Sequence, residues 1–199
     1  LKPWHFIKAS RSVTGNKATT QGGGIYANAA NLTINGATIS NNQTTAAGSA
    51  GGGAYINAAS TTASITGATF SGNSALGGTT SDGGGLYVNG GTTTLSGTTV
   101  QNSVATRNGV GAFVNAGTLN LNSASVVQGG NAGANLGGGV YVAAAGTFNL
   151  NASTIQNNNA GIGAGLYNLG TATTTNGTIS GNVASNAAGS NDGGAGIDL

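Results

Sequence analysis

Residues 24–40 read GIYANAANLTINGATIS, and this stretch decides the fold of the chain. It contains three short segments in which apolar and polar residues alternate, beginning at Ile25, at Leu32 and at Thr38. Alternation with a period of two is typical of β-strands and not of helices. Asparagine and glycine, which favour tight turns, lie between the segments. The stretch therefore predicts three short strands joined by turns.

Copies of this stretch recur along the whole chain. Each copy is marked by a glycine, an apolar residue and usually a tyrosine, and successive markers lie 26 to 32 residues apart. The markers are Gly24-Ile25-Tyr26, Gly53-Ala54-Tyr55, Gly85-Leu86-Tyr87, Gly111-Ala112-Phe113, Gly139-Val140-Tyr141, Gly165-Leu166-Tyr167 and the degenerate Gly196-Ile197-Asp198. Repeats of this length are typical of solenoids, and the leucine-dense or helix-forming segments of other solenoid classes are absent from the sequence. We predict an all-β, single-domain parallel β-helix, or β-solenoid, of about six to seven coils, each with roughly 28 residues and three short strands.

Equivalent positions in the copies predict which side chains face the core. Every second residue of a strand faces the same side, so apolar residues at equivalent positions stack above one another. The three predicted inward rows are Ile25, Ala54, Leu86, Ala112, Val140 and Leu166; Ile34, Ile65, Leu95, Leu121 and Leu150; and Ile39, Phe70, Val100, Ile155 and Ile179. A threonine row precedes the third inward row and is predicted to face outward, at Thr38, Thr69, Thr99, Thr154 and Thr178.

A polar residue three places after the third inward row is predicted to join the coils at a turn. This position holds Asn42, Asn73, Asn158 and Asn182, with Ser103 as the one substitution among these copies. An asparagine repeated at a turn can bond the coils above and below, which satisfies backbone groups that no sheet reaches. The glycine clusters are expected to provide positive φ angles and close approach at the other corner.

Two motifs in the repeat resemble a known repeat class. The residues Gly84-Gly85-Leu86 lie in a Gly-Gly-x-aliphatic motif, and Phe70-Ser71-Gly72-Asn73 form a Phe-x-x-Asn motif. The pair resembles the repeats of chlamydial polymorphic outer-membrane proteins and related autotransporter passengers, and the resemblance covers nearly the whole chain. It implies a right-handed β-helix at the cell surface, often with an adhesive function.

The composition disfavours most chemistry-bearing sites. The 199 residues include five Lys or Arg, three Asp or Glu, one His and no Cys, and the formal net charge is +2. Acid–base catalysis, metal coordination and nucleic-acid binding need clusters of such residues. We therefore expect no enzyme activity, no cofactor, no metal site and no nucleic-acid partner. Asp82 and Arg107 occupy similar places in neighbouring copies and are expected to form only a surface ion pair.

Two further features predict where the protein works. No apolar run approaches the roughly 18 residues that a membrane-spanning helix needs, so no membrane span is expected. The chain begins at Leu1 and not at Met, which predicts the removal of an N-terminal segment, most commonly a secretion signal. These features predict an extracellular or cell-surface protein.

The two ends of the chain predict complementary parts of one coil. Val13-Thr14-Gly15-Asn16 matches the third-strand motif, and counting back places Phe6 at the position of Leu32. The chain thus begins at a second strand, whereas residues 196–199 supply only a first strand. We divide the chain into an N-terminal partial coil and assembly segment (1–21), complete coils (22–192) and a C-terminal partial coil (193–199).

These partial coils predict a head-to-tail homopolymer, in which the strands of one subunit complete the last coil of its neighbour. Basic residues gather in the first segment and acidic residues in the last, so opposite charge is expected to set the polarity. The predicted subunit junction contains Lys2, Trp4, Phe6, Lys8, Arg11, Lys17, Asp192, Ile197, Asp198 and Leu199. In the alternative interpretation, residues 4–7 fold over the N-terminal opening as a plug.

Aromatic residues follow the first inward row and are predicted to face outward as a stripe. These residues are Tyr26, Tyr55, Tyr87, Phe113, Tyr141 and Tyr167. Exposed apolar stripes serve as contact surfaces. We favour lateral packing between filaments as the role of this stripe, and the alternatives are stacking of surface glycans and cover by a loop.

Three functional hypotheses follow from the sequence. The leading one is a secreted structural protein that self-assembles head to tail into an extracellular β-solenoid filament. The second is a monomeric autotransporter-type adhesin passenger at the cell surface. The third is an ice-binding protein, because a regular threonine row on a solenoid wall resembles ice-binding surfaces.

Overall fold

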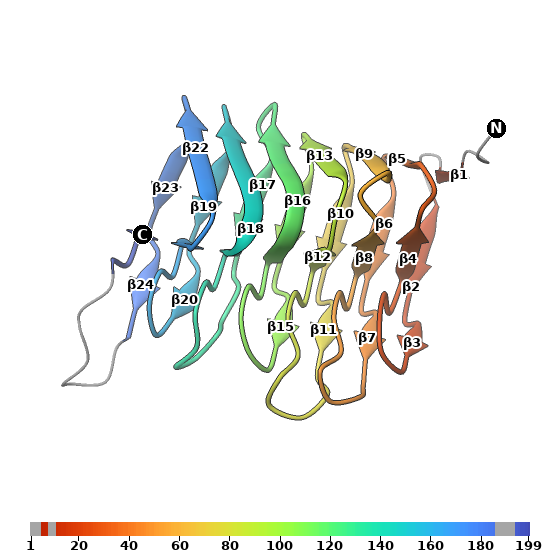
Figure 1. Ribbon diagram of the computed structural model, residues 1–199, viewed down its shortest axis with the longest axis horizontal. Coiled ribbons are helices and arrows are strands. Elements are labelled where there is room, and N and C mark those ends of the chain that lie inside the picture. The colour runs from red at the N-terminus through yellow and green to blue at the C-terminus, as the bar shows by residue number, and fades with distance from the viewer. Residues whose placement is uncertain (1–4, 8–10, 186–193) are drawn as a thin grey trace.

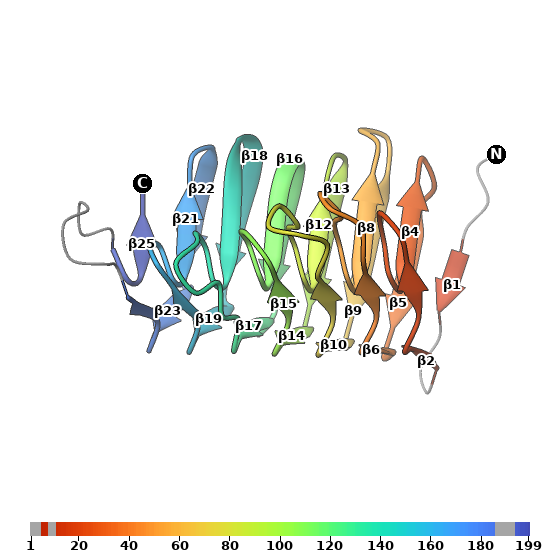
Figure 2. The same ribbon diagram turned by 90° about the horizontal axis from the view of Figure 1, so that it is seen from below.

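The computed structural model describes residues 5–7, 11–185 and 194–199, and these ranges contain β-strands but no helix. The strands are stacked in a β-solenoid of about 6 turns with a spacing of roughly 28 residues (Figure 1). Strands of successive coils pair in parallel, and the first and last coils lie at opposite ends of the long axis (Figure 2). The predicted all-β parallel solenoid is confirmed.

Each coil has three main walls, which we number in chain order. The first and second walls belong to one 12-stranded sheet, because β16 (Ala112–Asn122) and β18 (Val140–Asn151) run through both. The first wall contains β4 (Ile25–Asn28), β8 (Ala54–Asn57), β12 (Leu86–Val88), the starts of β16 and β18, β21 (Leu166–Asn168) and β25 (Ile197–Asp198). The second wall contains β1 (His5–Ile7), β5 (Leu32–Asn35), β9 (Thr62–Thr66), β13 (Thr92–Ser96), the ends of β16 and β18, and β22 (Thr171–Thr175). The third wall is a 7-stranded sheet of β2 (Ser12–Thr14), β6 (Thr38–Ser40), β10 (Thr69–Ser71), β14 (Thr99–Gln101), β17 (Val126–Gln128), β19 (Thr154–Gln156) and β23 (Thr178–Ser180).

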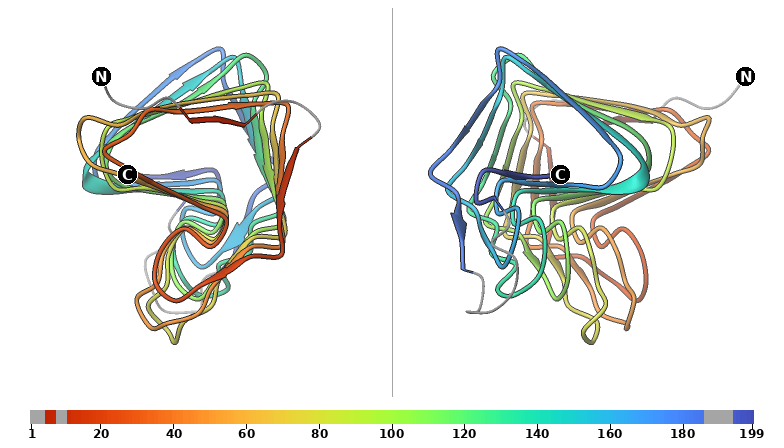
Figure 3. Two further views of the ribbon diagram at one scale, coloured as in Figure 1. Left: turned by 90° about the vertical axis from the view of Figure 1, so that its right-hand side faces the viewer. Right: turned by 60° about the vertical axis from the view of Figure 1, so that its left-hand side comes forward.

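A fourth strand of two residues follows the third wall and adds to the three strands predicted for each coil. These strands form a 4-stranded sheet of β3 (Lys17–Ala18), β7 (Gln43–Thr44), β11 (Ser74–Ala75) and β15 (Val104–Ala105), and a 2-stranded sheet of β20 (Asn159–Ala160) and β24 (Val183–Ala184). The loops after them project from one side of the cross-section before the chain returns to the first wall (Figure 3). Small side chains, including Ala75, Ala105 and Ala160, form a second apolar cluster there.

The main core is built from the predicted inward rows. Leu86, Leu95 and Val100 represent the three rows, and all are fully buried in one cluster. The register keeps each row intact, since Leu86 pairs with Ala54 on one side and with Ala112 on the other. The first wall adds a further inward row that was not predicted, at Ala27, Ile56, Val88, Val114 and Val142. The core is therefore a continuous apolar column along the rod.

A buried asparagine ladder holds the turn after the third wall. The side-chain Oδ1 of Asn73 accepts hydrogen bonds from the backbone N and the Nδ2 of Asn42, both at 3.0 Å. Asn73 Nδ2 donates to the carbonyl oxygen of Ile39 at 2.8 Å. The ladder continues to Asn16, whose backbone N donates to Asn42 Oδ1 at 3.0 Å. The predicted bonding between coils is confirmed.

A glycine triplet turns the chain before most strands of the first wall. In the triplet 51–53, Gly51 has a φ of +65°, and a Cβ on Gly52 would lie 2.3 Å from the carbonyl oxygen of Ser74. The first glycine is needed for its backbone conformation and the second for the close approach of two coils. Both predicted roles of the glycine cluster are confirmed.

Candidate functional site

The N-terminal end of the solenoid presents four free strand edges. Within the described residues, β1, β2, β3 and β4 each pair on one side only, with β5, β6, β7 and β8. In these ranges the N–H and C=O groups of their other edges have no sheet partner, and such edges recruit further strands. Arg11 and Lys17 are exposed at this end, which is therefore cationic.

The C-terminal end presents the same four kinds of edge. Among the residues that the structure describes, β22, β23, β24 and β25 pair only with β18, β19, β20 and β21. Because all strands of a wall are parallel, the free edges at both ends run in the same direction and follow the same order around the coil. The two ends are thus complementary, strand for strand.

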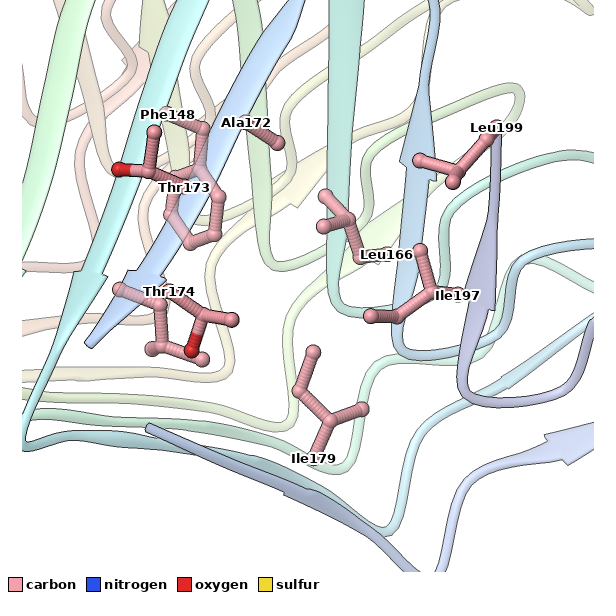
Figure 4. A pocket seen from close by; sticks show the side chains of 9 residues that line it. Phe148, Leu166, Ala172, Thr173, Thr174, Ile179, Ile197 and Leu199 are labelled. Atoms are coloured by element: carbon pink, nitrogen blue, oxygen red, sulfur yellow. The ribbon is translucent and has the colours of Figure 1, made fainter. Parts of the chain in front are cut away.

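Counting only the residues that the structure describes, the apolar core is open at the C-terminal end. A hollow of about 200 Å³ is lined by Phe148, Leu150, Ile179, Ile197, Leu199 and neighbouring side chains (Figure 4). It exists because β22 places Ala172 and Thr174 beside Phe148 and Leu150, so small side chains follow large ones in the inward rows. Leu199 is 89% exposed at the rim. This end therefore exposes apolar surface of the kind that the middle coils bury.

The predicted junction residues lie at both ends of the rod, and one molecule does not bring them together. Arg11 and Lys17 lie at the N-terminal end, and Ile197, Asp198 and Leu199 lie at the C-terminal end (Figure 1). Phe6 lies in β1, and the predicted junction residues Lys2, Trp4, Lys8 and Asp192 lie outside the described residues.

The structure corrects two expectations about the first strand. β1 pairs with β5 so that His5 lies beside Leu32 and Phe6 lies beside Thr33, one residue away from the predicted register. The reason is that the connection from β1 to β2 is one residue longer than the equivalent connection in the next coil. Residues 5–7 extend the second wall, so the alternative interpretation of residues 4–7 as a plug is wrong for these three.

The aromatic stripe is a continuous stack on the outer face of the first wall. Successive ring centroids lie 4.6 to 5.6 Å apart, with interplanar angles from 3° to 28°. Ala54 and Ala112 belong to the core cluster and the rings that follow them do not. Tyr26, at the end of the stack, is 48% exposed, whereas Tyr55 and Phe113 are 5% and 6% exposed. Each middle ring is covered on both faces by its neighbours, and the loops project beside this wall (Figure 3). The faces of the middle rings are therefore not available to a ligand.

Burial disfavours the ionised form of three tyrosines in this stack. Burial raises the pKa of the hydroxyls of Tyr55, Tyr87 and Tyr141, and an adjacent tyrosine hydroxyl in the stack raises each of them further. The raised pKa values keep these phenols neutral in moderately alkaline solution.

Asp82 and Arg107 form the predicted ion pair and join two neighbouring loops. Arg107 donates from Nε to Asp82 Oδ1 at 2.9 Å and from Nη2 to Asp82 Oδ2, and the backbone N of Asn108 donates to Oδ1 at 3.0 Å. The hydrogen bond to Asp82 raises the pKa of the Arg107 guanidinium. Asp82 is buried and Arg107 is exposed, so the carboxylate lies deeper than the predicted surface pair. The arrangement satisfies Asp82 and holds the loops together.

Two outer amide ladders were not predicted from the sequence. Beside the ring stack, each side-chain Nδ2 donates to the Oδ1 of the preceding coil at 2.8 to 3.0 Å, along Asn28, Asn57, Asn89 and Asn115. On the third wall, Nε2 donates to Oε1 at 2.8 to 3.0 Å along Gln101, Gln128 and Gln156. The asparagines lie two residues after the aromatic row, and Gln101 and Gln156 lie two residues after members of the threonine row. The repeat alignment, extended by two positions, contains the signal for both ladders.

The predicted threonine row lies on the outer face of the third wall. Thr69 pairs with Thr38 and with Thr99, as expected from the repeat. Val126 interrupts the row before Thr154. The wall is therefore regular in spacing but mixed in chemistry.

The fold and these ladders define a β-solenoid repeat protein. In the part of the chain that the structure describes, no three His, Cys, Asp or Glu side chains gather in a group that could bind a metal ion. The same part contains no helix with the length and hydropathy for a bilayer crossing. No family model, curated protein or solved structure matches the chain.

Proposed function

We propose that this β-solenoid is a secreted structural protein that assembles head to tail into an extracellular filament. The observation that carries the proposal is the match between the two ends of the rod. β1 to β4 and β22 to β25 present the same four edges in the same order. A second copy placed at either end gives every free edge a parallel partner.

Backbone pairing and apolar contact supply the affinity in this proposal. Each backbone hydrogen bond formed at the junction contributes about 0.5–1.5 kcal/mol, and burial of the open core adds roughly 25 cal/mol per Å². Charge sets the polarity, because Arg11 and Lys17 lie at one end and Asp198 lies at the other. An exposed ion pair contributes no more than about 1 kcal/mol, so charge alone does not hold the junction together.

Light scattering and negative-stain electron microscopy of the wild-type chain and two variants test the proposal. Ile197→Lys places a charge in the open core, and we expect it to abolish large particles while the coils stay folded by circular dichroism. Val104→Lys is the matched control, since Val104 is 46% exposed and Ile197 is 41% exposed, but Val104 lies on the side of the rod. The control is expected to assemble like the wild type.

Three results would count against end-to-end assembly. Loss of filaments in both variants would point to lateral contacts instead. Normal filaments in the Ile197→Lys variant would show that the open core is not part of the junction. A stable 18.8 kDa wild-type species at high concentration would overturn the proposal and favour the adhesin passenger. Ice binding stays a prediction that a thermal hysteresis measurement tests.

A further inference from the structure

We propose a specific register for the junction, an inference that rests on the proposed head-to-tail assembly. In this register Ile197 of one copy lies beside Ile25 of the next copy, and Ile179 lies beside Val13. The next copy is therefore placed as one more coil of the same solenoid. Three features of the two ends support this placement.

The first feature is the apolar rows. On the first wall, Leu166 pairs with Ile197 at one end of the rod, and Ile25 pairs with Ala54 at the other. Val13 and Ile25 are only partly buried at the N-terminal end and pack against the core from one side. Placed beside Ile179 and Ile197, they cover the hollow at the C-terminal end, whose lining includes both of those residues. The register thus continues two inward rows without a break.

The second feature is the polarity of the buried asparagine ladder. In each step an asparagine donates from its backbone N and its Nδ2 to the Oδ1 of the asparagine one coil further along the chain. Asn158 does so to Asn182 at 3.0 and 2.9 Å. Among the described residues, Asn182 has no following asparagine to receive its backbone N–H, and Asn16 Oδ1 receives no hydrogen bond. A donor is left at one end and an acceptor at the other.

The proposed register joins these two groups. Asn182 of one copy donates to Asn16 Oδ1 of the next copy, as Asn158 donates to Asn182. Asn16 Nδ2 of the next copy reaches the carbonyl oxygen of Ile179, in the way that Asn182 Nδ2 donates to Ile155 at 3.1 Å. A shift of the junction by two residues along the strands would leave both groups unpaired, and buried unpaired groups cost about 1–3 kcal/mol each.

The third feature is the end of the aromatic stack. Asp198 pairs with Tyr167, so it occupies the position of the next ring. In the proposed register Asp198 lies beside Tyr26 of the next copy, the ring at the end of the stack, which is 48% exposed. The stripe of one copy is then separated from the stripe of the next by one acidic residue.

Cysteine crosslinking tests the register, because the natural chain contains no cysteine. Thr14 and Ser180 are exposed on the third wall and occupy equivalent positions in its first and last strands. The register makes them direct neighbours across the junction, about 4.8 Å apart between Cα atoms, which is within the range of a disulfide. The two positions lie at opposite ends of one molecule, so an intramolecular disulfide is excluded (Figure 1).

The test compares two double variants under mild oxidation. Thr14→Cys with Ser180→Cys is expected to give a ladder of disulfide-linked multimers on a non-reducing gel. Thr14→Cys with Thr178→Cys is the matched control, displaced by two residues on the same strand, and it is expected to give at least about tenfold less multimer because its Cα atoms lie beyond about 7 Å. An equimolar mixture of the single variants Thr14→Cys and Ser180→Cys is expected to stop at dimers.

The outcomes separate the register from the assembly itself. Equal crosslinking of both double variants, or crosslinking of the control alone, overturns the register. Filaments without crosslinks in the first double variant also overturn the register but leave head-to-tail assembly in place. A wild-type chain that forms no filaments refutes the proposed function, and the register fails with it.

Discussion

Asn73 forms hydrogen bonds with three groups of the preceding coil, and Asn42 and Asn182 form equivalent bonds in their own coils. Its Oδ1 accepts from the backbone N and the Nδ2 of Asn42, and its Nδ2 donates to Ile39. One coil later the ladder has a gap, because the buried hydroxyl of Ser103 has no hydrogen-bond partner. The two positions therefore separate the effect of the amide from the effect of burial.

Asn73→Ala is expected to lower the free energy of unfolding by about 2–4 kcal/mol, because it leaves a buried backbone N–H of Asn42 without an acceptor. Ser103→Ala serves as the control and is expected to change that free energy by less than about 0.5 kcal/mol, since no hydrogen bond is lost. Urea denaturation followed by circular dichroism measures both. Comparable losses in the two variants would show that the amide ladder does not stabilise the turn.

Turns between elements depend on glycine for two different reasons. Gly52 lies against the backbone of Ser74, and a Cβ there would come within 2.3 Å of the carbonyl oxygen. Gly67 has a φ of +58° but open space around it. Gly67→Ala is expected to cost about 1 kcal/mol from the left-handed backbone alone. Gly52→Ala must separate two coils, so it is expected to lower the free energy of unfolding several times more. Urea unfolding measures both variants. A smaller loss of unfolding free energy for Gly52→Ala than for Gly67→Ala would contradict the role of close approach.

Three tyrosines of the aromatic stack are expected to make the stability of the fold depend on pH in alkaline solution. Burial raises the pKa values of Tyr55, Tyr87 and Tyr141 in the folded state above the ordinary value of 10.0. The folded chain then binds more protons than the unfolded chain above that pH, so the stabilisation is complete below about pH 10 and is lost as the pH rises further. We expect the unfolding temperature to fall steeply above pH 10 in thermal scans. In a variant with phenylalanine at these three positions, the unfolding temperature should fall less over the same pH range. An identical fall in the two proteins would rule out the phenols as the cause.

Elements with a strict period could be predicted from the sequence, and elements without one could not. The inward rows, the threonine row and the asparagine turn recur at fixed offsets, so Leu86, Thr69 and Asn73 were placed correctly. The register of β1 was missed because one extra residue in its connection leaves no mark in the composition. The burial of Phe113 was missed because alternation gives the direction of a side chain but not what covers it.

The whole molecule gains stability from neighbours in the proposed assembly. In the part of the chain that the structure describes, the end coils pair on one side only. A second copy that binds the folded state therefore raises the apparent stability by mass action. The unfolding temperature is therefore expected to rise with protein concentration in differential scanning calorimetry. The Ile197→Lys variant provides the reference, since its unfolding temperature should not depend on concentration. If the unfolding temperature of the wild type did not depend on concentration, the ends would not associate in the measured range.

The loops that leave each coil on the same side have a consequence for the appearance of a long assembly. Successive loops form a ridge along one flank of the rod, and the right-handed twist of parallel strands turns each coil slightly relative to the last. In a filament of many subunits this ridge follows a helical path around the filament axis. Its pitch would be visible as layer lines in the diffraction of averaged images, and it would report the rotation per coil directly.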